Sequence, residues 1–128
     1  MPMYTVSSHS PLPSDTREEI ANLIMNVHCR LTGAPETFVN VVFSHNVPHR
    51  RGVKMNIFGN VRKGRTPEMN RQLVDALREE ILASTKYPSR SLELTLFEVP
   101  ASWVMEGGEV LPEPGEEESC EWLNTAED

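Results

Sequence analysis

The chain has 128 residues, of which 38% are hydrophobic and 24% are charged, and its formal net charge is -7. This length suits one domain with its own core, and no apolar run approaches the roughly 18 residues of a membrane-spanning helix. The start of the chain lacks the basic and apolar regions of a signal peptide. We therefore expect a cytoplasmic protein that binds neither membranes nor, given its acidic charge, nucleic acid.

The charge is unevenly spread along the chain. Six of the 12 Lys and Arg residues fall within residues 50–65, where there is no acid, whereas nine of the 19 acids lie from Glu106 onward. The basic stretch predicts an anion site. The two cysteines, Cys29 and Cys120, lack the spacing of a zinc site. His45 and His49 have the spacing of metal ligands on a helix, but Pro48 between them favours a loop. We expect ordinary thiols, no metal and no cofactor.

The first predicted elements are a strand, a helix and a second strand. Residues 3–8 are β-prone, and the prolines of HSPLP end that run. A helix begins at Ser14, or at Thr16 with Glu19 as a capping box, and ends at Gly33. Its apolar stripe, which also carries His28, consists of Ile20, Leu23, Ile24, Val27 and Leu31. Residues 38–44 are rich in β-branched and aromatic residues, which predicts a buried strand.

The second half of the chain repeats this order. Residues 54–58 predict a short strand, and residues 59–66 a connection with two glycines. Thr66-Pro67-Glu68 is typical of a helix start. The buried face of this helix comprises Leu73, Ala76, Leu77 and Ile81. Residues 92–99 alternate between apolar and polar side chains, as in a half-buried strand, and the remainder is rich in Gly, Pro and Glu.

Two β-α-β units, at about residues 3–45 and 54–99, predict an α+β fold with a four-stranded sheet and two helices on one face. We assign this domain to residues 1–115 and an acidic tail to residues 116–128. The other sheet face is left bare, because the available apolar residues cannot cover it alone. Those residues are Trp103, Val104, Leu111 and Trp122. A homo-oligomer that packs its sheets inward would cover it.

Pro2 follows the initiator methionine and is small enough for that methionine to be removed. It would then present a secondary amine. An ordinary α-amino group titrates at about 7.7–8.0, and burial or nearby cations lower that pKa. Such an amine suits general acid–base catalysis. The alternative is a chance occurrence, since proline makes up roughly 5% of average composition.

Four segments together resemble the tautomerase superfamily. They are MPMY at residues 1–4, HCRLTG at 28–33, RKGR at 62–65 and EVPASWVMEGGEVLPEPG at 98–115. Within that superfamily the chain resembles the branch of cis-3-chloroacrylic acid dehalogenase. The resemblance implies the tautomerase (MIF-like) fold, a homotrimer with its sheets inside, no cofactor, and an amino-terminal proline at the floor of each active site.

The resemblance also implies a role for each site residue. Pro2 is the catalytic proline, Arg62 and Arg65 bind the substrate carboxylate, His28 hydrogen-bonds the same end of the substrate, and Glu106 activates water in relatives. Planar guanidinium groups ahead of a helix N-terminus independently favour a carboxylate. Each assignment has an alternative. Arg62 and Arg65 could belong to a solvated basic loop that pairs with the acidic tail. His28 could be a core histidine with its hydrogen bonds satisfied, and Glu106 a solvated acid.

The chain departs from the haloacrylate-hydrating relatives, which carry a tyrosine in the strand ahead of the EVP segment. Here that strand has Thr95, Leu96 and Phe97, and only Tyr4 and Tyr87 are tyrosines. This argues against efficient dehalogenation. The leading hypothesis is a tautomerase, or isomerase, acting on small 2-oxo acids or unsaturated carboxylates. The alternatives are a hydratase or dehalogenase of 3-substituted acrylates that uses Glu106, and a non-catalytic trimeric ligand-binding protein.

Overall fold

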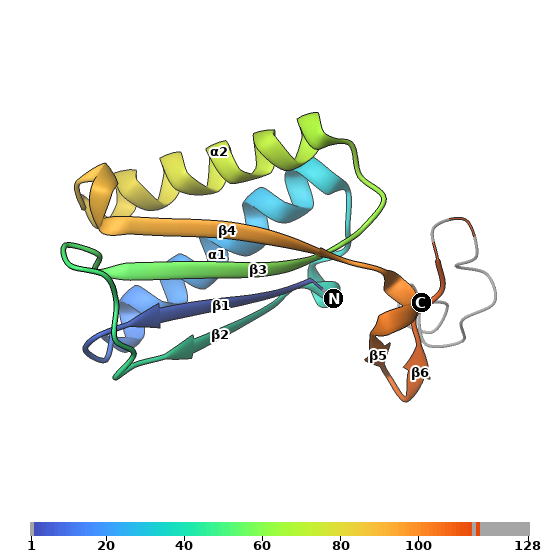
Figure 1. Ribbon diagram of the computed structural model, residues 1–128, viewed down its shortest axis with the longest axis horizontal. Coiled ribbons are helices and arrows are strands. Elements are labelled where there is room, and N and C mark those ends of the chain that lie inside the picture. Colours follow the sequence, from blue (N-terminus) through green and yellow to red (C-terminus); the bar gives the residue numbers. More distant parts are fainter. Residues whose placement is uncertain (1, 114, 116–128) are drawn as a thin grey trace.

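The computed structural model describes residues 2–113 and 115, so the predicted acidic tail lies outside the described residues. A four-stranded sheet is covered on one face by two helices that lie side by side (Figure 1). The elements are β1 (Met3–Ser8), α1 (Ser14–Thr32), β2 (Asn40–Ser44), β3 (Met55–Arg62), α2 (Pro67–Thr85), β4 (Leu92–Val99), β5 (Met105–Glu106) and β6 (Glu109–Val110).

The strand pairing confirms the two predicted β-α-β units. β1 pairs in parallel with β2, and β3 pairs in parallel with β4, while the two units meet where β1 runs antiparallel to β3. The resulting strand order is β2-β1-β3-β4. The short β5–β6 hairpin extends beyond the end of this sheet, near the start of β1 (Figure 1).

β3 is longer than predicted, because residues 59–62 continue the strand instead of forming a connection. Gly59 interrupts the β pattern in the sequence, but it pairs with Tyr4 of β1 and with Leu96 of β4. A Cβ atom at Gly59 would lie 2.7 Å from atoms of both neighbouring side chains, so the glycine leaves room for the Tyr4 ring. The additional strand residues carry Arg62 to the end of the sheet.

β2 begins two residues later than predicted, because a short 3-10 turn at Glu36–Phe38 follows Pro35. The first of the two predicted starts of α1 is correct, whereas the capping box of Thr16 and Glu19 is wrong, because Thr16 lies within the helix. α1 begins at Ser14, and its final turn closes on Gly33, which adopts the left-handed conformation (φ 77°) and donates its backbone N–H to the Cys29 carbonyl.

α2 begins at the predicted cap. The Thr66 hydroxyl accepts a hydrogen bond from the Met69 backbone N–H at 3.1 Å, and Pro67 occupies the first turn.

Thr66→Ala should lower the free energy of unfolding by about 1 kcal/mol, measured by denaturant titration, because it leaves that N–H without its partner. Thr66→Ser retains the oxygen and should lose much less; equal losses in both variants would contradict the cap.

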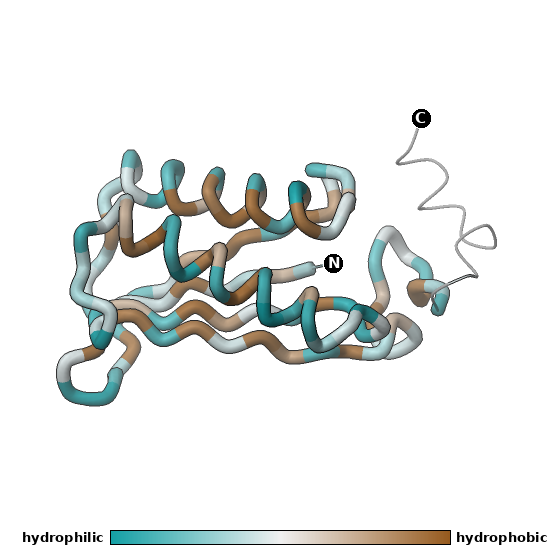
Figure 2. The backbone as a smooth tube through the Cα atoms, turned by 90° about the horizontal axis from the view of Figure 1, so that it is seen from above, coloured by the Kyte–Doolittle hydropathy of each residue, from teal (hydrophilic) through white to brown (hydrophobic). Residues whose placement is uncertain are grey.

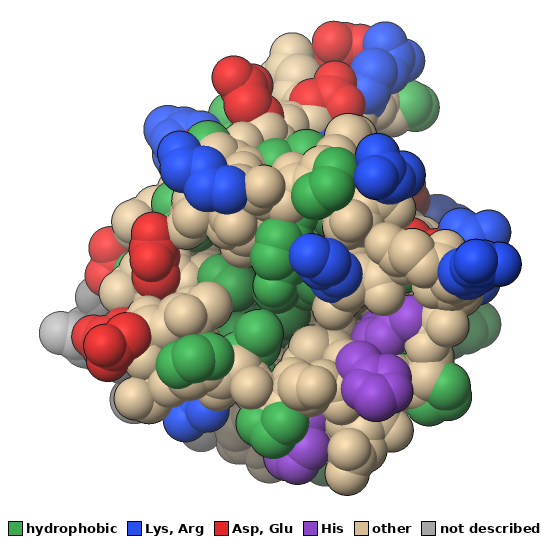
Figure 3. Space-filling model, turned by 90° about the vertical axis from the view of Figure 1, so that its left-hand side faces the viewer, with side chains coloured by type: hydrophobic (Ala, Val, Ile, Leu, Met, Phe, Trp, Pro, Cys, Tyr) green, Lys and Arg blue, Asp and Glu red, His purple; other side chains and the backbone are tan. Residues whose placement is uncertain are grey.

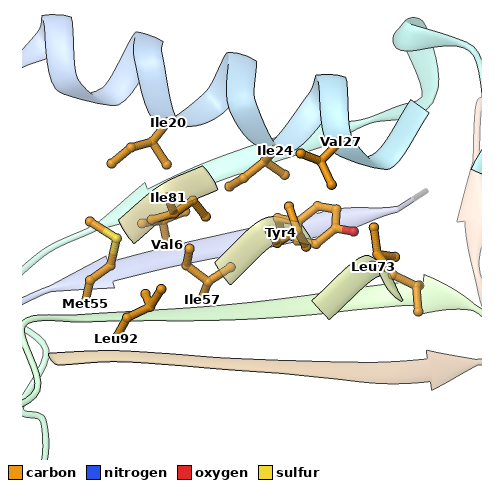
Figure 4. Close-up of a cluster of buried hydrophobic side chains, with 12 residues drawn as sticks. Tyr4, Val6, Ile20, Ile24, Val27, Met55, Ile57, Leu73, Ile81 and Leu92 are labelled. Atoms are coloured by element: carbon orange, nitrogen blue, oxygen red, sulfur yellow. The ribbon is translucent and has the colours of Figure 1, made fainter. Parts of the chain in front are cut away.

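The core lies between the sheet and the two helices (Figure 4). Its fully buried side chains alternate along the strands and recur at helical spacing, and Figure 2 shows the matching hydrophobic positions along both helices. They include Tyr4, Val6, Ile20, Ile24, Val27, Ile57, Leu73, Leu77 and Ile81. His28 is buried among them, as its place on the predicted stripe implies.

The opposite face of the sheet exposes several apolar side chains. Met3, Val42 and Phe97 are 43%, 45% and 50% exposed, and the rings of Phe58 and Phe97 stack with centroids 4.6 Å apart. Exposed apolar surface of this kind marks an interaction site more often than a free face. Within the described residues, no helix is long and apolar enough to cross a membrane.

Candidate active site

A cavity of about 190 Å³ lies at the end of the sheet where β1 begins and β3 ends. Three segments that are distant in sequence form it: the start of β1, the connection between α1 and β2, and the turn after β3. Its lining residues are Pro2, Thr32, Ala34, Pro35, Phe38, Arg62 and Arg65. Three of the five predicted site residues therefore share one small cavity.

Pro2 is buried and held by the strand pairing. Its carbonyl oxygen accepts a hydrogen bond from the Asn40 backbone N–H at 3.0 Å, which extends the parallel pairing of β1 with β2 by one residue. The proline is thus fixed at the edge of the cavity.

Arg62 and Arg65 line the same cavity from the end of β3 and the following turn. Arg62 Nη2 donates to the Pro112 carbonyl at 3.3 Å, and Arg65 Nη1 donates to the Arg62 carbonyl at 3.2 Å. Burial lowers the pKa of Arg65, and the Arg62 charge lowers it further. No described carboxylate forms an ion pair with Arg65. Two guanidinium groups ahead of the α2 N-terminus form a site suited to a carboxylate.

His28 and Tyr4 lie in the layer beneath this cavity and are fully buried. The Tyr4 hydroxyl and His28 Nδ1 are 2.8 Å apart, and the rings meet edge to face. Burial lowers the pKa of His28 to about 4, and the positive charge of Arg65 adds to this effect. His28 is therefore neutral near pH 7, and none of the described cavities is lined by it.

Glu106 lies in β5 and lines a different cavity, of about 510 Å³. The other lining residues of that cavity are Met3, Asn40, Asn60, Val99, Val104 and Met105. Asn40 and Asn60 both pair with Met3, so this second cavity lies against the start of β1. Within the described part of one chain, the fold does not bring Glu106 into the cavity of Pro2.

The remaining candidate residues lie elsewhere. Histidine side chains gather with Lys and Arg at the end of the molecule opposite the Pro2 cavity (Figure 3), and there Ser7 Oγ lies 3.2 Å from His49 Nε2. Among the described residues, no group of three or more His, Cys, Asp or Glu side chains could hold a metal ion. Burial raises the pKa of Cys29, and the negative charge of Glu36 raises it further. A raised pKa disfavours a reactive thiolate.

Sequence reasoning missed the apolar wall of the Pro2 cavity and the partner of His28. The wall is formed by Ala34, Pro35 and Phe38. Phe38 was assigned to a strand, and no local signal marks its side chain as facing Pro2. The sequence weakly indicates the position of Tyr4. Residues two apart on a strand share a face, so Tyr4 lies on the same side of the sheet as Pro2.

The sequence matches no protein-family model, and a comparison with curated proteins finds no match. Solved structures are similar. One is a member of the cis-3-chloroacrylic acid dehalogenase family termed N1, with 26% identity and a TM-score of 0.81; the alignment covers 96% of this chain and 91% of that one. Another is Ps01740, with 26% identity, a TM-score of 0.74, and coverage of 81% and 99%.

A third similar structure is a fused 4-OT asymmetric trimer, with 18% identity, a TM-score of 0.75, and coverage of 84% of this chain and 94% of that one. At that identity the likeness concerns the fold. The resemblance predicted from the sequence is therefore confirmed: this chain has the fold of the tautomerase superfamily and is similar, over nearly its whole length, to a member of the cis-3-chloroacrylic acid dehalogenase family.

Proposed function

We propose that this protein is a cofactor-independent tautomerase that acts on small 2-oxo acids or unsaturated carboxylates. The observation that carries the proposal is the shared cavity of Pro2, Arg62 and Arg65. Once the initiator methionine is removed, the Pro2 amine would share this cavity with two guanidinium groups, which are well suited to bind a carboxylate. The cavity volume of about 190 Å³ limits the substrate to a small molecule.

In this mechanism the guanidinium groups of Arg62 and Arg65 hold the substrate carboxylate, which fixes carbon 3 near the Pro2 nitrogen. In ketonisation, the protonated amine donates a proton to carbon 3 while the enol oxygen releases its proton to water. In the reverse direction, the neutral amine removes a proton from carbon 3 while the oxo oxygen accepts a proton from water. An amine with a pKa near neutrality can serve in both directions.

The apolar wall of Ala34, Pro35 and Phe38 supports this assignment. It provides a surface for the non-carboxylate end of the substrate. No described carboxylate lines the cavity, so proton transfer there rests on the amine itself.

The test is ketonisation of an arylpyruvate enol, followed by ultraviolet absorbance, with protein whose loss of Met1 has been verified by intact mass. Turnover is expected in this protein and should depend on Pro2. If the processed protein shows no turnover above the buffer rate, the tautomerase proposal is wrong. Carboxylate binding without turnover would then favour the non-catalytic ligand-binding alternative.

The hydratase alternative receives less support from the geometry of one chain. Glu106 lines another cavity, and the segment Thr95-Leu96-Phe97, in the strand where relatives carry a tyrosine, has none. Hydration of an acetylenic acid that is lost in Glu106→Gln would nevertheless establish that activity. Hydration that is undetectable in the unaltered protein would exclude it.

We also propose that the protein forms a homotrimer with the open sheet faces inside. The exposed apolar side chains of Met3, Val42 and Phe97 support this arrangement, as does the similar fold of the fused 4-OT trimer. Phe97→Glu should reduce the mass measured by sedimentation equilibrium to that of a monomer, because it places a charge in the apolar contact. Asn22→Glu, on an exposed position of α1, should leave the trimer intact.

A further inference from the structure

We propose that Tyr4 is a positioning residue of the Pro2 site: its hydroxyl fixes His28 in the tautomer that carries its proton on Nε2. His28 thereby offers a neutral hydrogen-bond donor in the layer beneath the cavity. This inference rests on the proposed function, because it assigns His28 to the substrate's oxo or enol oxygen.

The backbone places both residues one layer below the cavity. Tyr4 follows Pro2 by two positions on β1, so their side chains lie on the same face of the sheet. His28 precedes Thr32 by one turn of α1, and Thr32 lines the cavity. Burial lowers the pKa of His28, and the positive charge of Arg65, another lining residue, lowers it further. The pair therefore adjoins the proposed carboxylate site.

The hydrogen-bond inventory determines which group donates. If Tyr4 O–H donates to His28 Nδ1 at 2.8 Å, both of those atoms are satisfied and the ring proton must lie on Nε2. If Nδ1–H donated instead, the Tyr4 proton would lack an acceptor among the described residues. Burial also raises the pKa of Tyr4, so its hydroxyl retains the proton that it donates.

Nε2 of His28 is buried and has no hydrogen-bond partner among the described residues. A buried donor without a partner is unfavourable, and a substrate oxygen that reached Nε2 from the cavity above would supply the missing acceptor. Because His28 is neutral, it adds a donor without adding a third positive charge to the two arginines. That combination fits a substrate with one carboxylate and one uncharged oxygen, which is a 2-oxo monocarboxylic acid or its enol.

The sheet holds the Tyr4 ring in place. Tyr4 pairs directly with Gly59 of β3, and a Cβ atom at Gly59 would come within 2.7 Å of Tyr4 Cε1 and 2.9 Å of Tyr4 Cδ1. Real side chains almost never make such close contacts, so the ring occupies the space that the missing Gly59 side chain leaves. A ring confined in this way keeps its hydroxyl in one place, 2.8 Å from Nδ1 of His28 on α1.

The first test is spectroscopic and does not depend on activity. The 15N shifts of the His28 ring, measured near pH 7, should show a protonated Nε2 and an unprotonated Nδ1 in the unaltered protein. Tyr4→Phe should move this population toward the other tautomer, whereas Tyr87→Phe should not. A proton on Nδ1 in the unaltered protein would overturn the proposal.

A second measurement does not require a Tyr4 variant to fold. In Tyr87→Phe, Tyr4 is the sole tyrosine. An unperturbed tyrosine has a pKa of about 10, so a buried Tyr4 should show no phenolate absorbance near that pH. Phenolate that forms there in the folded protein would show that the Tyr4 hydroxyl is not the buried donor described above.

Kinetics test whether Tyr4 acts through His28. Tyr4→Phe should lower kcat/KM for enol ketonisation roughly 10-fold, about the value of one hydrogen bond. In His28→Gln the amide supplies a donor near the Nε2 position without a tautomer, so adding Tyr4→Phe should cause no further loss. Losses that multiply would overturn the coupling. If no variant turns over, the proposed function fails, while the ring spectra still decide the tautomer.

Discussion

Pro2→Ala should lower kcat for ketonisation of an arylpyruvate enol by about 100-fold. A positioned acid–base group typically contributes about 10²–10⁴-fold. Alanine retains an α-amino group after methionine removal, which places the loss at the lower end of this range. It lacks the ring that holds the nitrogen at one orientation beside the cavity. Stopped-flow absorbance with saturating substrate measures the effect.

Two comparisons separate the Pro2 amine from general effects on the fold. A protein that retains Met1 carries an amide at the Pro2 nitrogen and should lose the whole acid–base contribution. Pro11→Ala alters an exposed proline at the other end of the sheet and should retain full turnover. Turnover that survives in the Met1-retaining protein would exclude the Pro2 amine as the proton-transfer group.

Lowering the pH from about 7 to about 5 should reduce the free energy of unfolding through His28 by about 2 kcal/mol. The His28 pKa is about 4 in the folded protein, whereas an unperturbed histidine has a pKa of about 6.5. Between those values the unfolded chain binds a proton that the folded protein does not. Stability from this group is therefore complete above the unfolded pKa and falls as the pH drops toward the folded one.

The measurement is urea unfolding at several pH values and one protein concentration. His28→Gln removes the titrating group, so its unfolding free energy should depend less steeply on pH over this range. His9→Gln changes an exposed histidine and should keep the steep dependence. Equal slopes in the unaltered protein and in His28→Gln would contradict a buried neutral His28.

The arrangement of elements could be predicted from local patterns in the sequence. The apolar stripe of α1, the cap at Thr66 and the left-handed Gly33 are decided by neighbouring residues, and the structure confirms each of them. Two β-α-β units of similar length permit few topologies, because crossover connections are right-handed. The sequence motifs predict Pro2, Arg62 and Arg65 as site residues, and the fold brings all three to one cavity.

The tertiary structure alone decided how far β3 extends and what lies beneath the site. Gly59 signals a break in the sequence, yet the ring of Tyr4 from another strand fills its space and lets the strand continue to Arg62. The bond between Tyr4 and His28 spans 24 residues, and Glu106 lies in a cavity apart from Pro2. Such features depend on contacts between distant segments, which propensity and periodicity do not encode.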